Sequence, residues 1–266
     1  MHPILFSLPL FSHSIDIYAY PVFLIFAGLV VIGGTIRFAK IRNLPMRSIA
    51  WMLFAMLMAA LVGARMLHIL VNFGAYAKNP SLIYSFDDSG FSLFGGVIFA
   101  VITGYVMCRM SKVNFWKFAD TITPFLGIGI AMVRIGCFLN GCCFGKITSL
   151  PWGVTFPFFS EAHKYQMSQS QTTLLTVRPV HPTQIYELLA ALTGSLLAMY
   201  VIKRKTTNGT AALVFALWFT VFRWIDYYFM VQLPTFQASP YFYPFLYFGL
   251  ILVCLFFLLR KSYPNL

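Results

Sequence analysis

The stretch YAYPVFLIFAGLVVIGGTI, residues 18–36, decides the fold class of this chain. It carries no charged side chain, and Arg37 follows it directly. About 20 helical residues cross the hydrocarbon core of a bilayer, so this stretch is predicted to span a membrane. The other stretches of similar apolar character lie at about 49–73, 91–109, 119–138, 183–202, 209–233 and 241–259. We therefore predict an all-α polytopic membrane protein with about seven transmembrane helices.

The composition excludes an ordinary soluble protein. Apolar residues make up 59% of the 266 residues and charged residues only 10%, whereas soluble domains average about 25% charged residues. The net charge of +12 could suggest a nucleic-acid partner. Its basic residues lie in small clusters between apolar stretches, which is the pattern of membrane topology, so we expect no nucleic-acid binding.

The distribution of basic residues predicts the orientation of the chain. Lys and Arg concentrate in the first, third and fifth connections and in the C-terminal tail, and such clusters mark the cytoplasmic side. The N-terminus is therefore predicted to lie outside and the C-terminus in the cytoplasm. The basic residues on the predicted cytoplasmic side are Arg37, Lys40, Arg42, Arg47, Arg109, Lys112, Lys117, Lys203, Arg204, Lys205, Arg260 and Lys261.

We expect a single membrane domain over residues 1–266, with one long connection between the fourth and fifth spans. This connection, 139–182, is rich in Gly, Pro, Ser, Thr and Gln, and loops of that length are usually functional or disordered. Its aromatic residues predict that it packs as a small external cap. These are Phe156, Phe158, Phe159 and Tyr165.

Three arginines, Arg65, Arg134 and Arg223, lie inside predicted spans. An intramembrane arginine costs at least about 2.5 kcal/mol on insertion scales, so it is rarely idle. The guanidinium groups would repel one another unless an anion or carboxylates lay between them. A phospholipid phosphate fits, since arginine can bind phosphate through two hydrogen bonds. Alternatively, the arginines reach the outer interface, or pair with Asp226 or Glu187.

His68 follows Arg65 by three residues and shares one helix face with it. A histidine beside an arginine near the outer surface is a candidate for proton transfer. A purely structural histidine remains the alternative.

The segment RIGCFLNGCCFG, residues 134–145, is predicted to form a ligand-binding turn. Its three glycines permit a sharp chain reversal and a close backbone approach to a ligand. Backbone N–H groups in such a turn can bind an anion, although a tight structural turn is the alternative. The segment HPTQIYE, residues 181–187, opens the fifth span. Its Gln184, Tyr186 and Glu187 place polar groups at the outer boundary.

These two segments resemble the bacterial prolipoprotein diacylglyceryl transferases. Residues 133–145 are similar to the family signature Gly-Arg-(Ile/Leu)-Gly-Asn-Phe-(Ile/Leu)-Asn-Gly-Glu-x-x-Gly, and residues 181–187 to His-Pro-Ser-Gln-Leu-Tyr-Glu. Weaker similarities lie at 63–65, 92–96 and 222–223. Seven spans with an external N-terminus also fit the family, which implies a multi-pass protein of the bacterial cytoplasmic (inner) membrane.

The resemblance implies an enzyme of lipoprotein biosynthesis that uses no cofactor. Family members transfer the diacylglyceryl group of phosphatidylglycerol to the lipobox cysteine thiol of a prolipoprotein, and glycerol phosphate leaves. Arg134 and Arg223 would then hold the phosphate as catalytic residues. The implied substrate-binding residues are Tyr18, Arg65, Asn140, Gly141, Gly145, Gln184, Tyr186 and Glu187.

The sequence departs from the family pattern mainly in its acid–base residues. Phe94 stands where the family has a histidine, Cys137 and Cys142 replace an asparagine and a glutamate, and Phe219 appears in place of a tyrosine. We therefore expect His68 or His181 to act as the replacement base.

Cys137, Cys142 and Cys143 cluster near the predicted cations, which lower a thiol pKa. They could carry a diacylglyceryl group transiently, act as a redox element, form a disulfide or pack inertly. A metal site lacks a fourth ligand at a recognisable spacing, so no metal is expected.

Three functional alternatives remain open. A divergent family member could use another acceptor, such as a small molecule, a glycan or another lipid. A second alternative is a phospholipid-binding membrane protein without catalysis. The third is a thiol-redox membrane protein built on the three clustered cysteines.

Overall fold

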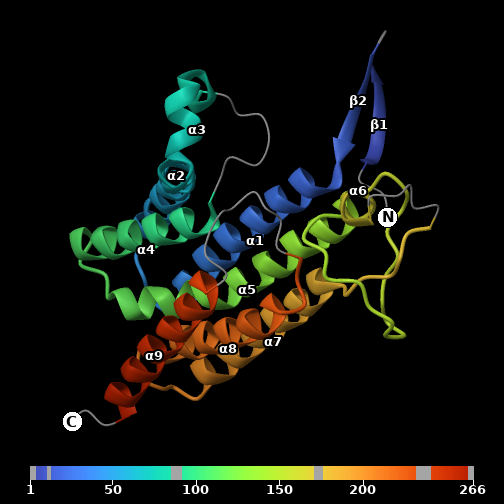
Figure 1. Ribbon diagram of the computed structural model, residues 1–266. Coiled ribbons are helices and arrows are strands. Elements are labelled where there is room, and N and C mark those ends of the chain that lie inside the picture. The colour runs from blue at the N-terminus through green and yellow to red at the C-terminus, as the bar shows by residue number, and fades with distance from the viewer. Residues whose placement is uncertain (1–3, 11–12, 85–91, 171–175, 232–240, 263–266) are drawn as a thin grey trace. The chain divides into compact units, whose positions relative to one another are not determined.

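The computed structural model describes residues 4–10, 13–84, 92–170, 176–231 and 241–262, and the statements below concern these residues. They form helices together with one antiparallel hairpin (Figure 1). In chain order the elements are β1 (Ile4–Leu10), β2 (His13–Tyr18), α1 (Ala19–Ile41), α2 (Met46–Val71), α3 (Phe73–Lys78), the 3₁₀ helix η1 (Pro80–Ile83), α4 (Leu93–Met110), α5 (Phe115–Asn140), α6 (Glu161–Ser170), α7 (Thr183–Lys203), α8 (Thr210–Tyr227) and α9 (Phe242–Ser262).

The helices confirm the predicted class of an all-α polytopic membrane protein. Six of the described helices, α1, α2, α5, α7, α8 and α9, are long and apolar enough to cross a membrane. The apolar segment Phe94–Met110 of α4 is shorter. It corresponds to the predicted third span, so each predicted span coincides with one of these helices.

Two helices end at positions several residues from the approximate ends of the predicted spans, for identifiable reasons. Helix α1 continues to Ile41 rather than ending near residue 36, since arginine and lysine are good helix formers. It ends where Asn43 adopts a φ of 53° and Leu44 N–H donates to the Ala39 carbonyl at 2.9 Å, a common C-terminal helix motif. Helix α8 ends at Tyr227, because the following Met230 pairs with Gly145 in an antiparallel bridge. Positions 232–233 of that predicted span lie outside the described residues.

The N-terminal hairpin was not predicted from the sequence. Strands β1 and β2 pair antiparallel, with Ile4 opposite Tyr18. The Ser7 hydroxyl donates to the Asp16 carboxylate at 2.6 Å across the pair. The hairpin leads directly into α1, so Tyr18 ends a strand rather than beginning a span.

The chain divides into two compact units, which are described separately. The first unit comprises residues 1–34 and 122–266. In it, α8 packs against both α7 and α9 (Figure 1). The indole Nε1 of Trp218 on α8 donates to the Ala190 carbonyl on α7 at 2.9 Å.

The second unit comprises residues 35–121 and is built around α2 and α4, which pack against each other. Ser92 N–H donates to the Ala64 carbonyl at 2.9 Å and so joins the start of α4 to α2. Arg42 donates to the Thr121 hydroxyl at 3.3 Å and the Lys117 carbonyl at 3.4 Å.

The 139–182 connection contains α6 and a small apolar core. Phe144, Phe156, Ala162 and Val180 are buried together, and Val180 bridges to Ile147 and Val154. Phe156 and Tyr165 therefore pack as predicted. The prediction was wrong for Phe158 and Phe159, which are 53% and 82% exposed. The four buried residues already fill the small core of this connection, so these two side chains are not part of it.

Candidate functional site

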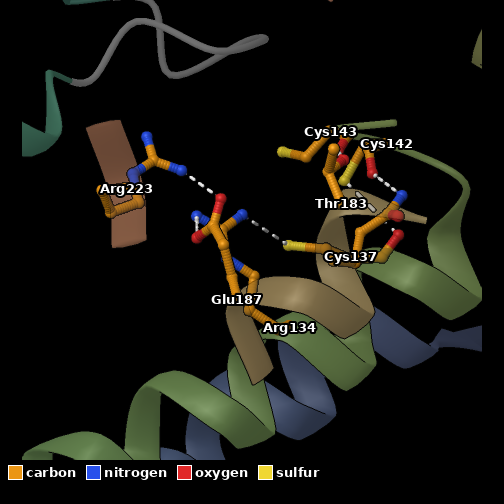
Figure 2. A network of polar contacts seen from close by, with 8 residues as sticks. Arg134, Cys137, Cys142, Cys143, Thr183, Glu187 and Arg223 are labelled. Carbon is orange, nitrogen blue, oxygen red and sulfur yellow. Dashed lines mark hydrogen bonds and ion pairs between the residues drawn. The ribbon is translucent and has the colours of Figure 1, made fainter. Parts of the chain in front are cut away.

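The centre of the site is a buried carboxylate between two arginines from different helices. Glu187 on α7 has a side chain that is only 1% exposed. Its Oε2 lies 2.5 Å from Arg134 Nη2 on α5, and its Oε1 accepts a hydrogen bond from Arg223 Nη1 on α8. Figure 2 shows both guanidinium groups turned toward this one carboxylate. The ion pairs therefore tie three helices together at one point.

The local sequence explains why Glu187 faces inward. Pro182 precedes α7 and fits a helix start, since it lacks the N–H that would have no partner there. Thr183, Gln184 and Glu187 are all buried, and positions spaced by three and four residues share one helix face. The polar residues of the first turn of α7 are thus buried against the rest of the first unit.

The hydrogen-bond donors of the two arginines leave capacity for an anionic ligand. Two guanidinium groups close together would repel strongly at low dielectric without a carboxylate between them. Asp226, one turn beyond Arg223, is buried and lies beside Glu187. Each guanidinium carries five N–H donors, more than the contacts with Glu187 and Cys137 use. The arginines can therefore also donate to a phosphate.

The three clustered cysteines converge beside Arg134. The Sγ atoms of Cys137, Cys142 and Cys143 all lie within 4.8 Å of one another. Arg134 Nη1 donates to Cys137 Sγ at 3.9 Å (Figure 2). Gly141 adopts a φ of 76°, a conformation that favours glycine, and reverses the chain directly after α5. The reversal brings Cys142 and Cys143 back toward Cys137.

The same first turn of α7 that carries Glu187 also holds the cysteine turn. The Thr183 hydroxyl donates to the Cys143 carbonyl at 2.7 Å, and Gln184 Nε2 donates to the Cys142 carbonyl at 2.6 Å. Thr183 was not among the predicted site residues, although it belongs to the 181–187 segment. Its role depends on a contact 40 residues away in the chain, which the sequence does not reveal.

The electrostatic surroundings make Cys143 an unusual thiol. Hydrogen bonds from the Cys137 and Cys142 thiols, together with the Arg134 guanidinium, hold the pKa of Cys143 far below its ordinary value. Burial opposes this shift but is outweighed. The cluster thus favours a thiolate at Cys143, as expected for a cysteine beside donors and a cation.

His181 and Tyr186 form a second polar group on the same segment. His181 Nδ1 lies 3.2 Å from the Tyr186 hydroxyl, which accepts a hydrogen bond from Trp152 Nε1 at 2.8 Å. Burial lowers the pKa of His181. A neutral imidazole can accept a proton, so His181 retains the property required of a base. Trp152 was not predicted, because a lone tryptophan in a loop carries no signal of its partner.

The turn residues predicted to bind substrate lie beside the cysteines and His181. Asn140 ends α5 and directly precedes the reversal at Gly141. Gly145 N–H donates to the His181 carbonyl at 2.9 Å. An added Cβ at Gly145 would lie 2.5 Å from the His181 Cβ, so only glycine permits this approach.

The remaining predicted residues are Tyr18, which lies in the first unit, and Arg65 and His68, which lie in the second. Tyr18 is 49% exposed at the end of β2. Arg65 and His68 both lie on α2 and contact the ring of Tyr76. Arg65 Nη2 also donates to the Ile83 carbonyl at 3.1 Å. The Glu187 cluster lies entirely in the first unit.

The sequence is similar to one family over nearly its whole length. The sequence model of the family described as prolipoprotein diacylglyceryl transferase matches residues 3–259. Curated proteins named phosphatidylglycerol–prolipoprotein diacylglyceryl transferase are also similar. The one from Finegoldia magna is 30% identical over 211 residues, which is 79% of this chain and 77% of the relative. The one from Pseudomonas fluorescens (strain ATCC BAA-477) is 31% identical over 176 residues, which is 65% of this chain and 61% of the relative.

Proposed function

The chain belongs to the prolipoprotein diacylglyceryl transferase family, and from this membership we propose that it is a membrane transferase. It moves the diacylglyceryl group of phosphatidylglycerol to the lipobox cysteine thiol of a prolipoprotein. The observation that carries the proposal is the pair Arg134 and Arg223 held on the buried Glu187. This pair supplies what the chemistry requires, namely fixed cations for a phosphate.

The charge on the phosphate increases during the reaction, and two arginines can stabilise this increase. The acceptor sulfur attacks the glyceryl carbon attached to the phosphate oxygen, and the carbon–oxygen bond breaks. The electron pair of that bond stays on the phosphate, which leaves as glycerol phosphate. A phosphate diester with one negative charge thereby becomes a monoester with a second developing charge. Cations that bind both forms stabilise the second more strongly, and this lowers the barrier.

Glu187 positions the two guanidinium groups in this proposal. Because both arginines are anchored on one buried carboxylate, they are oriented before substrate arrives. Preorganised donors need no rearrangement when the charge develops, which is the main source of electrostatic catalysis. Asn140 at the end of α5 and Gln184 on α7 would complete the contacts to the lipid head group.

The acceptor thiol must lose its proton, and we assign His181 as the base. It lies in the same compact unit as the arginines, and burial favours its neutral form. The other predicted candidate, His68, belongs to α2 of the second unit. We place the reaction at the outer face of the bacterial cytoplasmic membrane, in line with the orientation predicted from the basic clusters.

The experiment is a transfer assay in nanodiscs with labelled phosphatidylglycerol and a lipobox peptide. The wild type should yield lipidated peptide and free glycerol phosphate in equal amounts. Arg134→Ala should abolish both products. Arg178→Ala, a change at an exposed arginine of the 139–182 connection, is the matched control and should retain activity.

Each other outcome identifies a different function. Glycerol phosphate without lipidated peptide would indicate another acceptor. Binding of phosphatidylglycerol that depends on Arg134, without either product, would indicate a phospholipid-binding protein. Full activity in Arg134→Ala would contradict the role assigned to the arginine pair.

A further inference from the structure

Three thiols converge in the turn between α5 and the connection that follows it. Cys137 lies in the last turn of α5, and Cys142 and Cys143 follow the chain reversal. Their three Sγ atoms lie within 4.8 Å of one another. Zinc–sulfur bonds of about 2.3 Å place the sulfurs of a tetrahedral site about 3.8 Å apart, so small side-chain adjustments suffice.

We propose that Cys137, Cys142 and Cys143 bind one thiophilic metal ion. The experiments below use Zn(II) to test this. Thiolates are soft ligands that select ions such as Zn(II) and Cu(I) over Mg²⁺ or Ca²⁺. Neither the proposed transferase reaction nor the family comparison assigns a metal to this chain. The proposal therefore stands on the geometry of the thiols alone and does not depend on the transfer activity.

Residues of α7 hydrogen-bond the backbone of the segment that carries the proposed metal ligands. Thr183 and Gln184 fix the Cys143 and Cys142 carbonyls at 2.7 and 2.6 Å. Cys142 N–H donates to the Cys137 carbonyl at 3.1 Å, which closes the turn. Cys143 adopts a φ of 59°, which is uncommon for a residue with a side chain. These contacts orient the ligand-bearing residues as outer partners orient ligands in metal sites.

The charge of such a site is balanced by a neighbouring arginine. Three thiolates around Zn(II) leave one negative charge, which would be costly in buried surroundings without a counterion. Cys137 is 3% exposed, and Arg134 Nη1 lies 3.9 Å from its Sγ. Arg134 thus supplies the compensating positive charge while its other nitrogen contacts Glu187.

The fourth coordination position would be filled from outside the cluster. Among the described residues, no histidine, aspartate or glutamate joins the three cysteines as a possible ligand. Three protein ligands with an exchangeable water are the arrangement of catalytic zinc sites, whereas structural sites are closed by four. The sequence spacing alone argued against a metal site, because it offered no fourth ligand. The geometry of the three thiols instead fits a zinc site with three protein ligands and one open coordination position.

The test measures metal binding by the full-length reduced protein in detergent. Purified protein is stripped with chelator under anaerobic conditions, incubated with Zn(II), desalted and analysed by elemental mass spectrometry. One zinc per chain is expected for wild type. Loss of this zinc is expected in Cys142→Ser and Cys143→Ser. The control is a Cys108→Ala, Cys254→Ala double variant, which should still bind one zinc because these buried cysteines lie elsewhere.

A second measurement uses wild type only and therefore does not depend on how variants fold. Cysteine alkylation is followed by peptide mass spectrometry with and without Zn(II). Zinc should protect Cys137, Cys142 and Cys143 together and leave the other two cysteines unchanged. No bound zinc with all three thiols free and reduced would overturn the proposal. Zinc that survives both serine substitutions would also overturn it.

Discussion

Glu187 and Arg134 form an ion pair of 2.5 Å between α7 and α5, at a point where the glutamate side chain is almost inaccessible to solvent. The same helical turn holds the Cys142 and Cys143 carbonyls through Gln184 and Thr183. One turn of α7 therefore anchors both the guanidinium groups and the thiol cluster. The phosphate site and the cysteines are expected to respond together when this turn is disturbed.

Removing the shared carboxylate should destabilise the protein strongly. Glu187→Gln removes the buried carboxylate that both guanidinium groups contact, and breaking a buried pair costs about 3–5 kcal/mol. The measurement is denaturant unfolding in detergent micelles. The matched control is Glu161→Gln, because the Glu161–Lys164 pair is exposed and such pairs contribute about 0–1 kcal/mol. Equal losses in the two variants would contradict the role of Glu187 as the buried anchor.

Replacing an arginine by lysine should impair turnover although the charge is kept. A lysine at position 223 cannot hold Glu187 and also donate two parallel hydrogen bonds to a phosphate. We expect kcat/KM for phosphatidylglycerol to fall by about 10²–10³, the cost of losing one electrostatic donor. Transfer kinetics should show a loss in kcat for Arg223→Lys and no change for Arg178→Lys. A variant within twofold of wild type would rule out this contribution.

Gly145 should tolerate no side chain. A Cβ there would lie 2.5 Å from the His181 Cβ and 2.9 Å from the Phe229 carbonyl oxygen, so Gly145→Ala should destabilise by about 1–3 kcal/mol. In Gly28→Ala the new Cβ meets nothing within 4 Å, and α1 gains about 0.5–1 kcal/mol of helix propensity. Thermal unfolding should therefore shift in opposite directions. A shift of the same sign and size would show that the Gly145 approach is not tight.

His181 should make stability depend on pH in one direction. Burial lowers its folded-state pKa below the ordinary value of 6.5, so the neutral form is favoured by folding. Its contribution is complete above about pH 6.5 and is lost as the pH falls further. The unfolding temperature of wild type should therefore drop more than that of His181→Asn between about pH 7 and pH 5. Parallel curves for the two proteins would contradict this assignment.

The sequence predicted the spans well, because the length of an apolar helix that crosses a membrane follows from the thickness of the bilayer. An arginine inside the membrane is energetically costly, so it usually has a functional or structural role. Arg134 and Arg223 were singled out for this reason, whereas Glu187 was named as a polar residue at the start of the fifth span and as a possible partner of an arginine. The sequence did not predict that one carboxylate serves both arginines. That arrangement depends on how α5, α7 and α8 pack, and no local pattern specifies the packing.

The missed features depend on contacts that are distant in the chain or on backbone conformation. Pro9 within β1 argues against a strand, so the N-terminal hairpin carried no usable signal. The three cysteines were recognised as a cluster. Their convergence requires positive φ angles at Gly141 and Cys143, of which only the glycine could be anticipated. Trp152 binds Tyr186 across 34 residues, which no spacing rule covers.

The central claim is that Arg134 and Arg223 together hold the phosphate of phosphatidylglycerol. The most direct measurement is a crystal structure of the protein grown in a lipid phase that contains phosphatidylglycerol. We predict that phosphate oxygens of one lipid lie about 2.7–3.2 Å from nitrogens of both guanidinium groups, within ordinary hydrogen-bond distance. A bound lipid whose phosphate contacts neither arginine, with the Glu187 ion pairs intact, would contradict the account.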